Sequence, residues 1–198
     1  AGFTAAECVQ KLERSGMTPA SGPVLVTGAT GGVGSVAVKL LAQLGYEVAA
    51  VTGKEDKHDF LRSLGASEIL SREEANAGSD KPMLAERWGG VVDTVGGDIL
   101  FNGVKSLRYG CSLAACGLVA APVFSASVLP FILRHVNLLG IDSVQLPIEE
   151  KTEIWHRLGD EWLMDLSELE EVLTLDDVSD AIDRILAGKM VGRGVVHL

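Results

Sequence analysis

A glycine-rich loop between an apolar strand and a helix is the feature that most constrains this chain. Residues 24–34 read Val-Leu-Val-Thr-Gly-Ala-Thr-Gly-Gly-Val-Gly. This order of β-rich run, spaced glycines and helix-period segment is typical of a dinucleotide-binding βαβ unit. Gly28 would allow a sharp turn, and Gly31 or Gly32 would let the backbone approach a pyrophosphate. Gly34 would allow close packing of helix on strand, so the loop predicts a phosphate site at the helix start. A glycine turn without a ligand is the alternative.

The loop also narrows the class of nucleotide enzyme. No Lys-Ser or Lys-Thr pair follows it, which excludes a P-loop nucleotide hydrolase. Short-chain dehydrogenases share the loop but need a Tyr-x-x-x-Lys pair, and neither Tyr46 nor Tyr109 has a lysine four residues on. The cysteines and histidines show no metal-ligand spacing, so no metal site is predicted. Cys111 and Cys116 are interpreted as buried structural thiols in an apolar strand.

Apolar β-rich runs alternate with helix-period segments along the chain, separated by glycine. This pattern predicts an α/β fold, a Rossmann doubly wound parallel sheet of about six strands with helices on both faces. The predicted strands are 23–27, 47–52, 67–70, 88–94, 111–117 and 136–141, followed by helical stretches around 149–157 and 177–186 and an extended 195–196. Before the first strand, Thr4 and Glu7 form a capping-box pattern, which predicts that a helix opens there and ends near Gly16.

An uncharged run of 25 residues lies between Arg108 and Arg134, so a membrane span has to be considered. Glycines and prolines interrupt the run, including Pro122 and Pro130, which favours a buried strand, a loop and a short helix instead.

Charge and cysteine content restrict the partners and the compartment. The net charge is −10, and 13 acidic but only two basic residues lie between Glu149 and Asp183. The acidic balance argues against binding to nucleic acid or to a membrane surface. Three cysteines, an odd number, and an amino terminus without signal-peptide features favour a cytoplasmic protein.

The choice of nucleotide depends on the end of the second strand, about 20 residues past the loop, where NAD enzymes place an acidic residue on the ribose. Thr52, Gly53 and Lys54 stand there instead. A hydroxyl and an ammonium suit a 2′-phosphate, so the predicted cofactor is NADP(H). A solvated Lys54 beside Glu55 and Asp56 is the alternative.

Asp93 and Thr94 end the fourth predicted strand, and Asp93 is open to two interpretations. Its position would suit a catalytic carboxylate, whereas a short polar side chain after a strand also caps the next segment.

Several short motifs together resemble the medium-chain dehydrogenase/reductase superfamily. They are 27–34, Ser63-Leu64-Gly65-Ala66, Val92-Asp93-Thr94-Val95-Gly96, Ala115-Cys116-Gly117-Leu118, Pro130-Phe131-Ile132-Leu133-Arg134 and Gly140-Ile141-Asp142-Ser143. Residues 130–134 followed by 140–143 are the specific part, and the similarity runs through the whole chain. Within the superfamily the sequence most resembles the zinc-free acryloyl-CoA reductase branch, often labelled quinone oxidoreductases.

The resemblance implies that residues 1–198 are the NADP(H)-binding Rossmann domain of a two-domain enzyme, whose amino-terminal GroES-like domain is absent from this chain. By the same resemblance, the cofactor-binding residues are Gly28, Thr30, Gly31, Gly32, Val33 and Gly34 at the phosphate loop, Thr52, Gly53 and Lys54 at the 2′-phosphate, and Leu118, Ile132 and Ser143 at the nicotinamide half. Relatives can carry an arginine where this chain has Glu68, which is expected to weaken the preference for a 2′-phosphate.

The activity that the resemblance implies is hydride transfer from NADPH to the β-carbon of an α,β-unsaturated acyl thioester such as acryloyl-CoA, without zinc and with no catalytic residue assigned. A quinone as acceptor is one alternative, and a non-catalytic NADP(H)-binding module is another. The isolated domain is expected to be inactive. The apolar segment 120–133 is a candidate edge for a homodimer.

Overall fold

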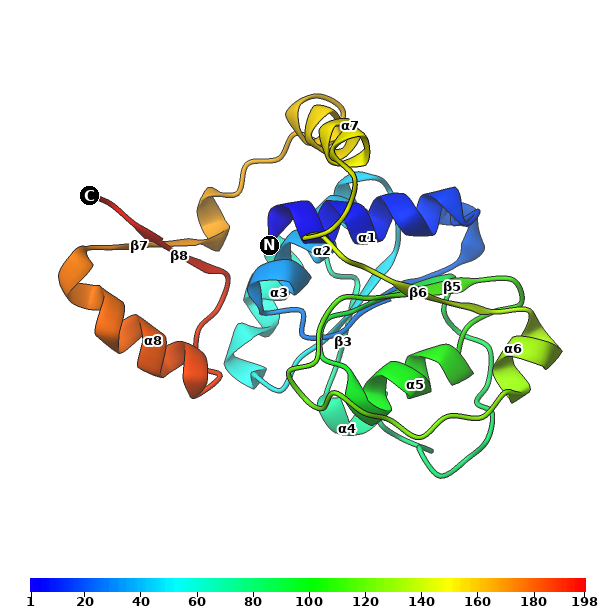
Figure 1. Cartoon of the computed structure of the whole chain (residues 1–198). Helices are drawn as coiled ribbons and strands as arrows, with labels where there is room; N and C mark the ends of the chain where they lie inside the picture. Colours follow the sequence, from blue (N-terminus) through cyan, green and yellow to red (C-terminus); the bar gives the residue numbers. More distant parts are fainter.

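The computed structural model describes residues Ala1–Leu198 and has a six-stranded parallel sheet at its centre (Figure 1). The sheet order is β3-β2-β1-β4-β5-β6. The strands are β1 Val24–Val26, β2 Val48–Val51, β3 Glu68–Leu70, β4 Gly90–Asp93, β5 Ser112–Ala115 and β6 Asn137–Gly140. The chain winds outward from β1 to β3, returns to β4 beside β1, and winds outward again in the other direction. This arrangement confirms the predicted doubly wound α/β fold.

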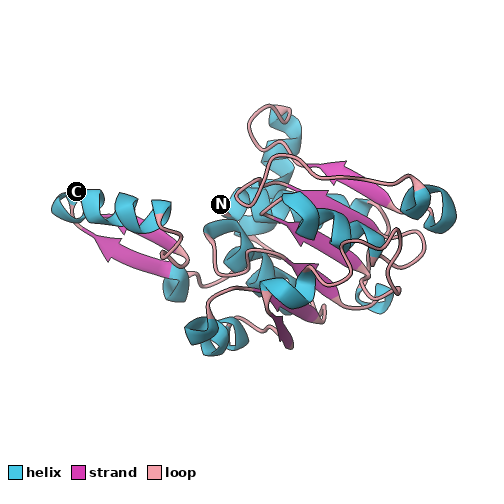
Figure 2. Cartoon of the chain, turned by 90° about the horizontal axis from the view of Figure 1, so that it is seen from below, coloured by secondary structure: helices cyan, strands magenta, loops and turns pink.

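Helices cover both faces of the sheet (Figure 2). On one face lie α1 (Gly2–Arg14), α2 (Gly32–Gln43) and α3 (His58–Ser63), and on the other α4 (Arg72–Ala75) and α5 (Gly97–Lys105). Successive side chains of β1 enter opposite cores: Val24 and Val26 pack with α1 and α2, whereas Leu25 packs with the α5 side. Both faces of the inner strands are therefore buried, as expected for a parallel sheet covered by helices on either side.

The start of α1 differs from the prediction. The helix begins at Gly2 with Ala1 as its N-cap, and no side chain caps it. Thr4 and Glu7 therefore lie inside the helix, and the predicted capping box is wrong. The Thr4 hydroxyl instead donates to Ser143 over 3.1 Å, and Glu7 is buried, because both side chains lie on the face that packs against the sheet.

The uncharged run forms β5, an exposed loop and the short helix α6 (Leu129–Arg134), as predicted. Arg134 fixes α6 to the body of the domain by donating to the carbonyls of Leu84 and Lys105. No helix in the structure combines the length and the apolar character needed to cross a membrane.

About the last quarter of the chain, residues 148–198, forms a tail outside the central sheet. Helix α7 (Ile148–Gly159) packs on α1, and Arg157 joins the two through an ion pair with Glu13 at 3.0 Å. Strands β7 (Glu170–Leu173) and β8 (Arg193–Val196) then form a separate two-stranded parallel sheet (Figure 2). Helix α8 (Val178–Leu186) lies in the connection from β7 to β8. Short 3-10 turns occur at Pro19–Ser21, Glu55–Lys57, Ser167–Leu169 and Leu175–Asp177. β7 was not predicted, because its Glu-Glu-Val-Leu sequence has no apolar run.

Candidate functional site

A cleft of about 200 Å³ lies at the carboxyl ends of the central strands, where the winding direction of the sheet reverses. In open α/β sheets this switch point is where ligands bind. The residues that line the cleft are Thr27, Gly28, Thr30, Val51, Thr52, Gly53, Arg72, Val95, Ile99, Val119 and Ala120. The cleft thus joins the phosphate loop predicted from the sequence to the end of β2.

Gly28 and Gly34 occupy positions in the loop that a larger residue could take only with displacement of its neighbours. Gly28 has φ +58°, and a Cβ there would lie 2.4 Å from the Thr94 hydroxyl. A Cβ on Gly34 would lie 2.3 Å from the carbonyl oxygen of Gly28, because α2 crosses the loop at close range. No side chain caps α2, whose N-cap is Gly31, so its first N–H groups remain available to a ligand. These features fit a pyrophosphate held on the helix N-terminus.

Asp93 holds the start of the glycine-rich loop through hydrogen bonds to both of its carboxylate oxygens. The Thr27 hydroxyl donates to one carboxylate oxygen over 2.7 Å, and the backbone N–H of Gly96 donates to the other, also over 2.7 Å. Asp93 is fully buried, and burial raises the pKa of its carboxyl. Since both oxygens are used within the protein, the structure favours the capping interpretation over the catalytic one.

Thr52 and Lys54, two of the residues predicted to bind the 2′-phosphate, lie just after β2 and differ in burial and in hydrogen-bond partner. The Thr52 side chain is buried and its hydroxyl accepts the backbone N–H of Lys54 over 3.1 Å. The Lys54 ammonium donates to the carbonyl of Met190 in the tail over 2.6 Å. Burial lowers the pKa of that ammonium. Lys54 therefore lies at the predicted place but already has a partner.

Arg72 was missed by the sequence analysis. Its guanidinium lies across Gly53, where an added Cβ would come within 2.7 Å of Nε. Ser71 and Glu74 form a capping box that starts α4 directly after β3, which places Arg72 at the carboxyl edge of the sheet. The Ser-x-x-Glu pattern after the third predicted strand was the signal that could have found it.

Glu68, expected to oppose a 2′-phosphate, lies at the other end of β3 from Arg72. Its carboxylate accepts a hydrogen bond from Arg87 at 2.6 Å. The negative charge is thus paired with Arg87 and lies at the amino end of β3, whereas the cleft lies at the carboxyl edge.

A second arginine reaches the loop from the tail. The backbone N–H of Gly192 donates to the carbonyl of Thr30 over 3.1 Å, which brings Arg193 beside Gly32. A Cβ on Gly32 would lie 3.1 Å from Cδ of Arg193. The guanidinium can therefore reach an anion bound at the start of α2. Nothing local in the sequence marked this residue, which lies more than 150 positions beyond the loop.

The three residues predicted at the nicotinamide half are not brought together. Leu118 follows β5 and is exposed beside the cleft residues Val119 and Ala120. Ser143 follows β6 at the same edge of the sheet. Ile132 lies on α6, which precedes β6 and so lies at the amino end of the sheet, opposite the cleft, with its side chain exposed (Figure 1). The structure thus gives Ile132 no place at the cleft.

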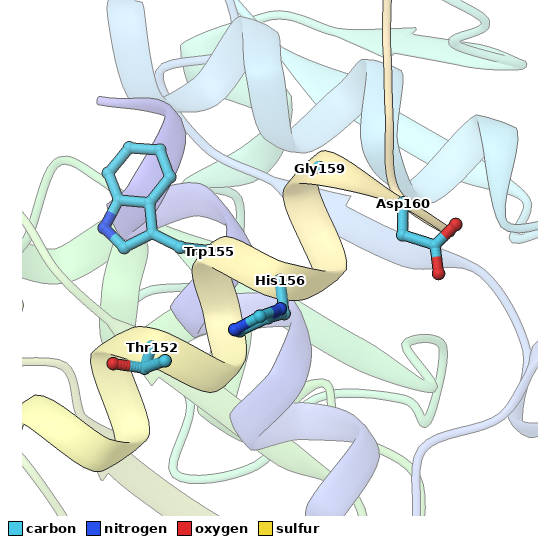
Figure 3. A pocket seen from close by; sticks show the side chains of 5 residues that line it. All are labelled: Thr152, Trp155, His156, Gly159 and Asp160. Atoms are coloured by element: carbon cyan, nitrogen blue, oxygen red, sulfur yellow. The ribbon is translucent and has the colours of Figure 1, made fainter.

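A larger hollow of about 400 Å³ lies on the outer side of α7 (Figure 3). Its five lining residues are Thr152, Trp155, His156, Gly159 and Asp160. The side chains of Trp155, His156 and Asp160 point in different directions, so they do not converge on a common point (Figure 3). The cleft at the glycine loop is therefore the better candidate site.

The side chains that could bind a metal ion do not gather at any point in the structure. No three His, Cys, Asp or Glu side chains lie close enough to hold one. Cys8, Cys111 and Cys116 are unpaired; Cys8 is buried, while Cys111 and Cys116 are partly buried beside β5 rather than within it. The residues present do not fit a zinc site.

Comparison with known proteins gives one family and several close relatives. Residues 32–159 match the family model described as "Zinc-binding dehydrogenase". The acrylyl-CoA reductase AcuI of Ruegeria pomeroyi is 49% identical over 199 residues, which covers 100% of this chain and 60% of that protein.

Two solved structures are also similar. The yhdH oxidoreductase of Salmonella enterica, in complex with NADP, has a TM-score of 0.93 and 42% identity, covering 100% of this chain and 60% of the other. The Bacillus subtilis protein yhfP, with NAD bound, has a TM-score of 0.95 and 42% identity, covering 99% and 60%. The chain thus spans about three fifths of the length of these relatives.

Proposed function

Because the chain belongs to the zinc-binding dehydrogenase family, within the medium-chain dehydrogenase/reductase superfamily, we propose that it is the NADP(H)-binding part of an enoyl-thioester reductase. The single observation that carries the proposal is the glycine loop at the switch point, whose Gly34 leaves no room for a Cβ against Gly28. It is supported by the relative named acrylyl-CoA reductase and by the NADP-bound structure.

The preference for NADP(H) is assigned to a group of donors at the carboxyl edge. Arg72 across Gly53 supplies a guanidinium fork suited to a phosphate, and the buried hydroxyl of Thr52 lies on the same strand end. Lys54 contributes positive charge from its place beside Met190. Arg193 is assigned to the pyrophosphate, together with the N–H groups of residues 31–34.

The proposed reaction is reduction of an α,β-unsaturated acyl thioester such as acryloyl-CoA. The cofactor supplies a hydride for the β-carbon, and the α-carbon takes up a proton, which gives the saturated thioester. This chain holds and orients the nucleotide, and most of the substrate pocket belongs to a GroES-like amino-terminal domain outside these residues. No zinc takes part in the proposed reaction.

The exposed apolar side chains of the tail agree with the proposal that a second, amino-terminal domain packs against this one. A two-stranded sheet is marginally stable by itself, and β7 and β8 leave Val172 and Val196 exposed, as α8 does Ile182 and Ile185. We assign this apolar surface to contact with the proposed amino-terminal domain.

The test is a calorimetric titration of this chain with NADPH and, in parallel, with NADH. Affinity for NADPH about tenfold above that for NADH, or about 1.4 kcal/mol, is expected. Equal affinities would remove the 2′-phosphate assignment. Binding of neither nucleotide would remove the proposal for this chain.

Two other functions compete with this one. A quinone as hydride acceptor has specific support, since a Bacillus subtilis relative at 43% identity is named a quinone oxidoreductase. Assay of the protein that includes the amino-terminal domain with acryloyl-CoA and with a benzoquinone separates the two acceptors. A non-catalytic NADP(H)-binding module would bind the nucleotide and oxidise NADPH with neither acceptor.

A homodimer is part of the proposal. β6 is an edge strand of the sheet and only partly buried, and the neighbouring Val128, Ile132 and Leu133 are exposed. Light scattering would give twice the chain mass for a dimer. The cytoplasm is the proposed compartment, in keeping with three unpaired cysteines.

A further inference from the structure

Glu7 is a buried carboxyl that the proposed function does not use. The residue is 3% exposed on the face of α1 that packs against the sheet. Neither of its oxygens forms a hydrogen bond, although the backbone N–H of Asp142 faces the carboxyl. A buried polar group without a partner is costly and rare in native proteins, and such groups concentrate at functional positions.

The contacts around Glu7 place it at the carboxyl edge of the sheet. One turn before it, the Thr4 hydroxyl donates to Ser143; one turn after it, the Lys11 ammonium donates to the carbonyl of Gly140 over 2.7 Å. Both partners lie at the end of β6 or just beyond it. Glu7 also lies near the thiol of Cys116, directly after β5. The carboxyl therefore faces the ends of β5 and β6.

This position lies on one side of the phosphate loop, and the 2′-phosphate donors lie on the other. Thr52 and Arg72 follow β2 and β3, on the opposite side of β1 from β4, β5 and β6. A dinucleotide with its pyrophosphate at the loop extends both ways across the edge. If the adenylate half lies over β2 and β3, as the proposed function requires, then the nicotinamide half lies on the side of Glu7.

The charges around Glu7 leave its protonation responsive to a new neighbour. Burial raises the pKa of the carboxyl, the nearby ammonium of Lys11 opposes that rise, and the carboxylates of Asp142 and Glu150 add to it. The titratable groups that face Glu7 are Lys11 on its own helix, Asp142 after β6, Glu150 on α7, and the thiols of Cys8 and Cys116. The ammonium of Lys11 is thus opposed by the carboxylates of Asp142 and Glu150, and an added positive charge nearby would favour the ionised form of Glu7.

We propose that Glu7 is a positioning residue that couples its proton to the redox state of the bound nucleotide, holding the proton beside the reduced, neutral ring and releasing it beside the oxidised, cationic ring. This inference rests on the proposed function. The O–H bond of the carboxyl breaks, the electron pair stays on the carboxylate, and the proton passes to the buffer. Glu7 thereby favours the oxidised nucleotide over the reduced one as the pH rises.

The test measures the dissociation constants of NADP⁺ and NADPH for this chain at intervals between about pH 5, just above the ordinary pKa of a glutamate, and about pH 8.5. The 2′-phosphate titrates in both nucleotides, so its contribution cancels in the ratio of their affinities. For the unaltered chain we expect the affinity for NADP⁺ relative to NADPH to rise about three- to tenfold between these pH values. The Glu7→Gln variant should show a flat ratio, and the exposed Glu47→Gln variant should behave as the unaltered chain.

Proton release supplies an independent readout. Calorimetric titrations with NADP⁺ in two buffers of different ionisation enthalpy should show protons released by the unaltered chain in excess of those released with NADPH. Glu7→Gln should abolish the excess, and Glu7→Leu provides a second uncharged variant if the amide disturbs folding. A ratio in the unaltered chain that does not change with pH, or an equal change in Glu7→Gln, overturns this inference alone. Failure of the unaltered chain to bind either nucleotide overturns the proposed function and this inference with it.

Discussion

The Thr27 hydroxyl donates to the buried carboxylate of Asp93 over 2.7 Å, and so joins the ends of β1 and β4 at the point where the sheet reverses its winding. The same hydroxyl accepts the backbone N–H of Thr94 over 3.0 Å. The hydroxyl thus acts as donor and acceptor at once, and the second carboxylate oxygen accepts the N–H of Gly96. The shape of the cleft depends on this network.

Replacement of Asp93 by Asn should destabilise the fold. The amide nitrogen cannot accept a hydrogen bond, so either the Thr27 hydroxyl or the Gly96 N–H loses its acceptor inside the protein. We expect a loss of about 1–3 kcal/mol in the free energy of unfolding, measured by urea denaturation. Asp98→Asn, at an exposed position on α5, is the matched control. Equal stability of the two variants would contradict the capping role of Asp93.

Replacement of Gly34 by Ala should weaken nucleotide binding strongly. The added Cβ would lie 2.3 Å from the carbonyl of Gly28 and would push α2 away from the loop. Titration with NADPH should show at least about tenfold weaker binding, since close approach to the pyrophosphate is lost. Gly159→Ala on α7, where the added Cβ meets no atom within 4 Å, should leave binding unchanged. An intact affinity in Gly34→Ala would mean that the nucleotide does not use this loop.

Replacement of Arg72 by Gln should weaken binding of NADPH but not of NADH. The guanidinium across Gly53 is assigned to the 2′-phosphate, which NADH lacks. Loss of a charge-assisted contact of this kind costs about 1.5–3 kcal/mol, or roughly 10- to 100-fold in affinity. Arg62→Gln, exposed on α3, serves as the control. A parallel loss of affinity for both nucleotides would place Arg72 elsewhere on the ligand.

Replacement of Arg193 by Gln should weaken both nucleotides equally. This side chain lies beside Gly32 at the start of α2, so it is assigned to the pyrophosphate that NADPH and NADH share. Roughly tenfold weaker binding of each is expected from the lost ion contact. The comparison with Arg72→Gln is itself the control. If Arg193→Gln discriminated between the nucleotides, its assignment to the pyrophosphate would be wrong.

Replacement of Glu7 by Leu should stabilise the chain at neutral pH and above. The folded-state pKa of Glu7 is raised above its ordinary value of 4.5 by burial, so the carboxyl is tolerated best below that value, where it is protonated, and destabilises the fold increasingly as the pH rises through the folded-state pKa. Removing a buried polar group without a partner should add about 1–3 kcal/mol. Denaturation at several pH values should show the difference from the unaltered chain increasing with pH. A difference that shrinks as the pH rises would contradict the raised pKa.

The centre of the sheet was predictable because its inner strands β1, β2, β4 and β5 are buried and read as largely apolar runs. Val24, Leu25 and Val26 show this directly, since neighbours in sequence enter different cores and all must be apolar. β7 escaped prediction because its exposed Glu170 and half-buried Glu171 belong to neither core. The start of α1 was misplaced because Thr4 and Glu7 satisfy a local capping pattern but bury their side chains against distant residues.

The site was predictable where its requirements are local. Gly28 and Gly34 are six positions apart in the sequence and lie against each other in the loop. The spacing of the two glycines was therefore enough to predict the phosphate loop. Arg72 and Arg193 reach the same cleft from β3 and from the tail, and only the winding of the chain brings them there. Ile132 illustrates the opposite case, since a residue inferred by resemblance lies on the helix that precedes its strand rather than follows it.

The contact between the tail and the glycine loop makes nucleotide affinity sensitive to the last residues of the chain. The backbone N–H of Gly192 donates to Thr30, and the carbonyl of Met190 accepts from Lys54, so the loop and the end of β2 are both held by the same three-residue stretch, 190–192. A fragment cut before this stretch would keep every strand of the central sheet and still lose part of its ligand site. The boundary of the folding unit and the boundary of the binding unit are therefore different in this protein.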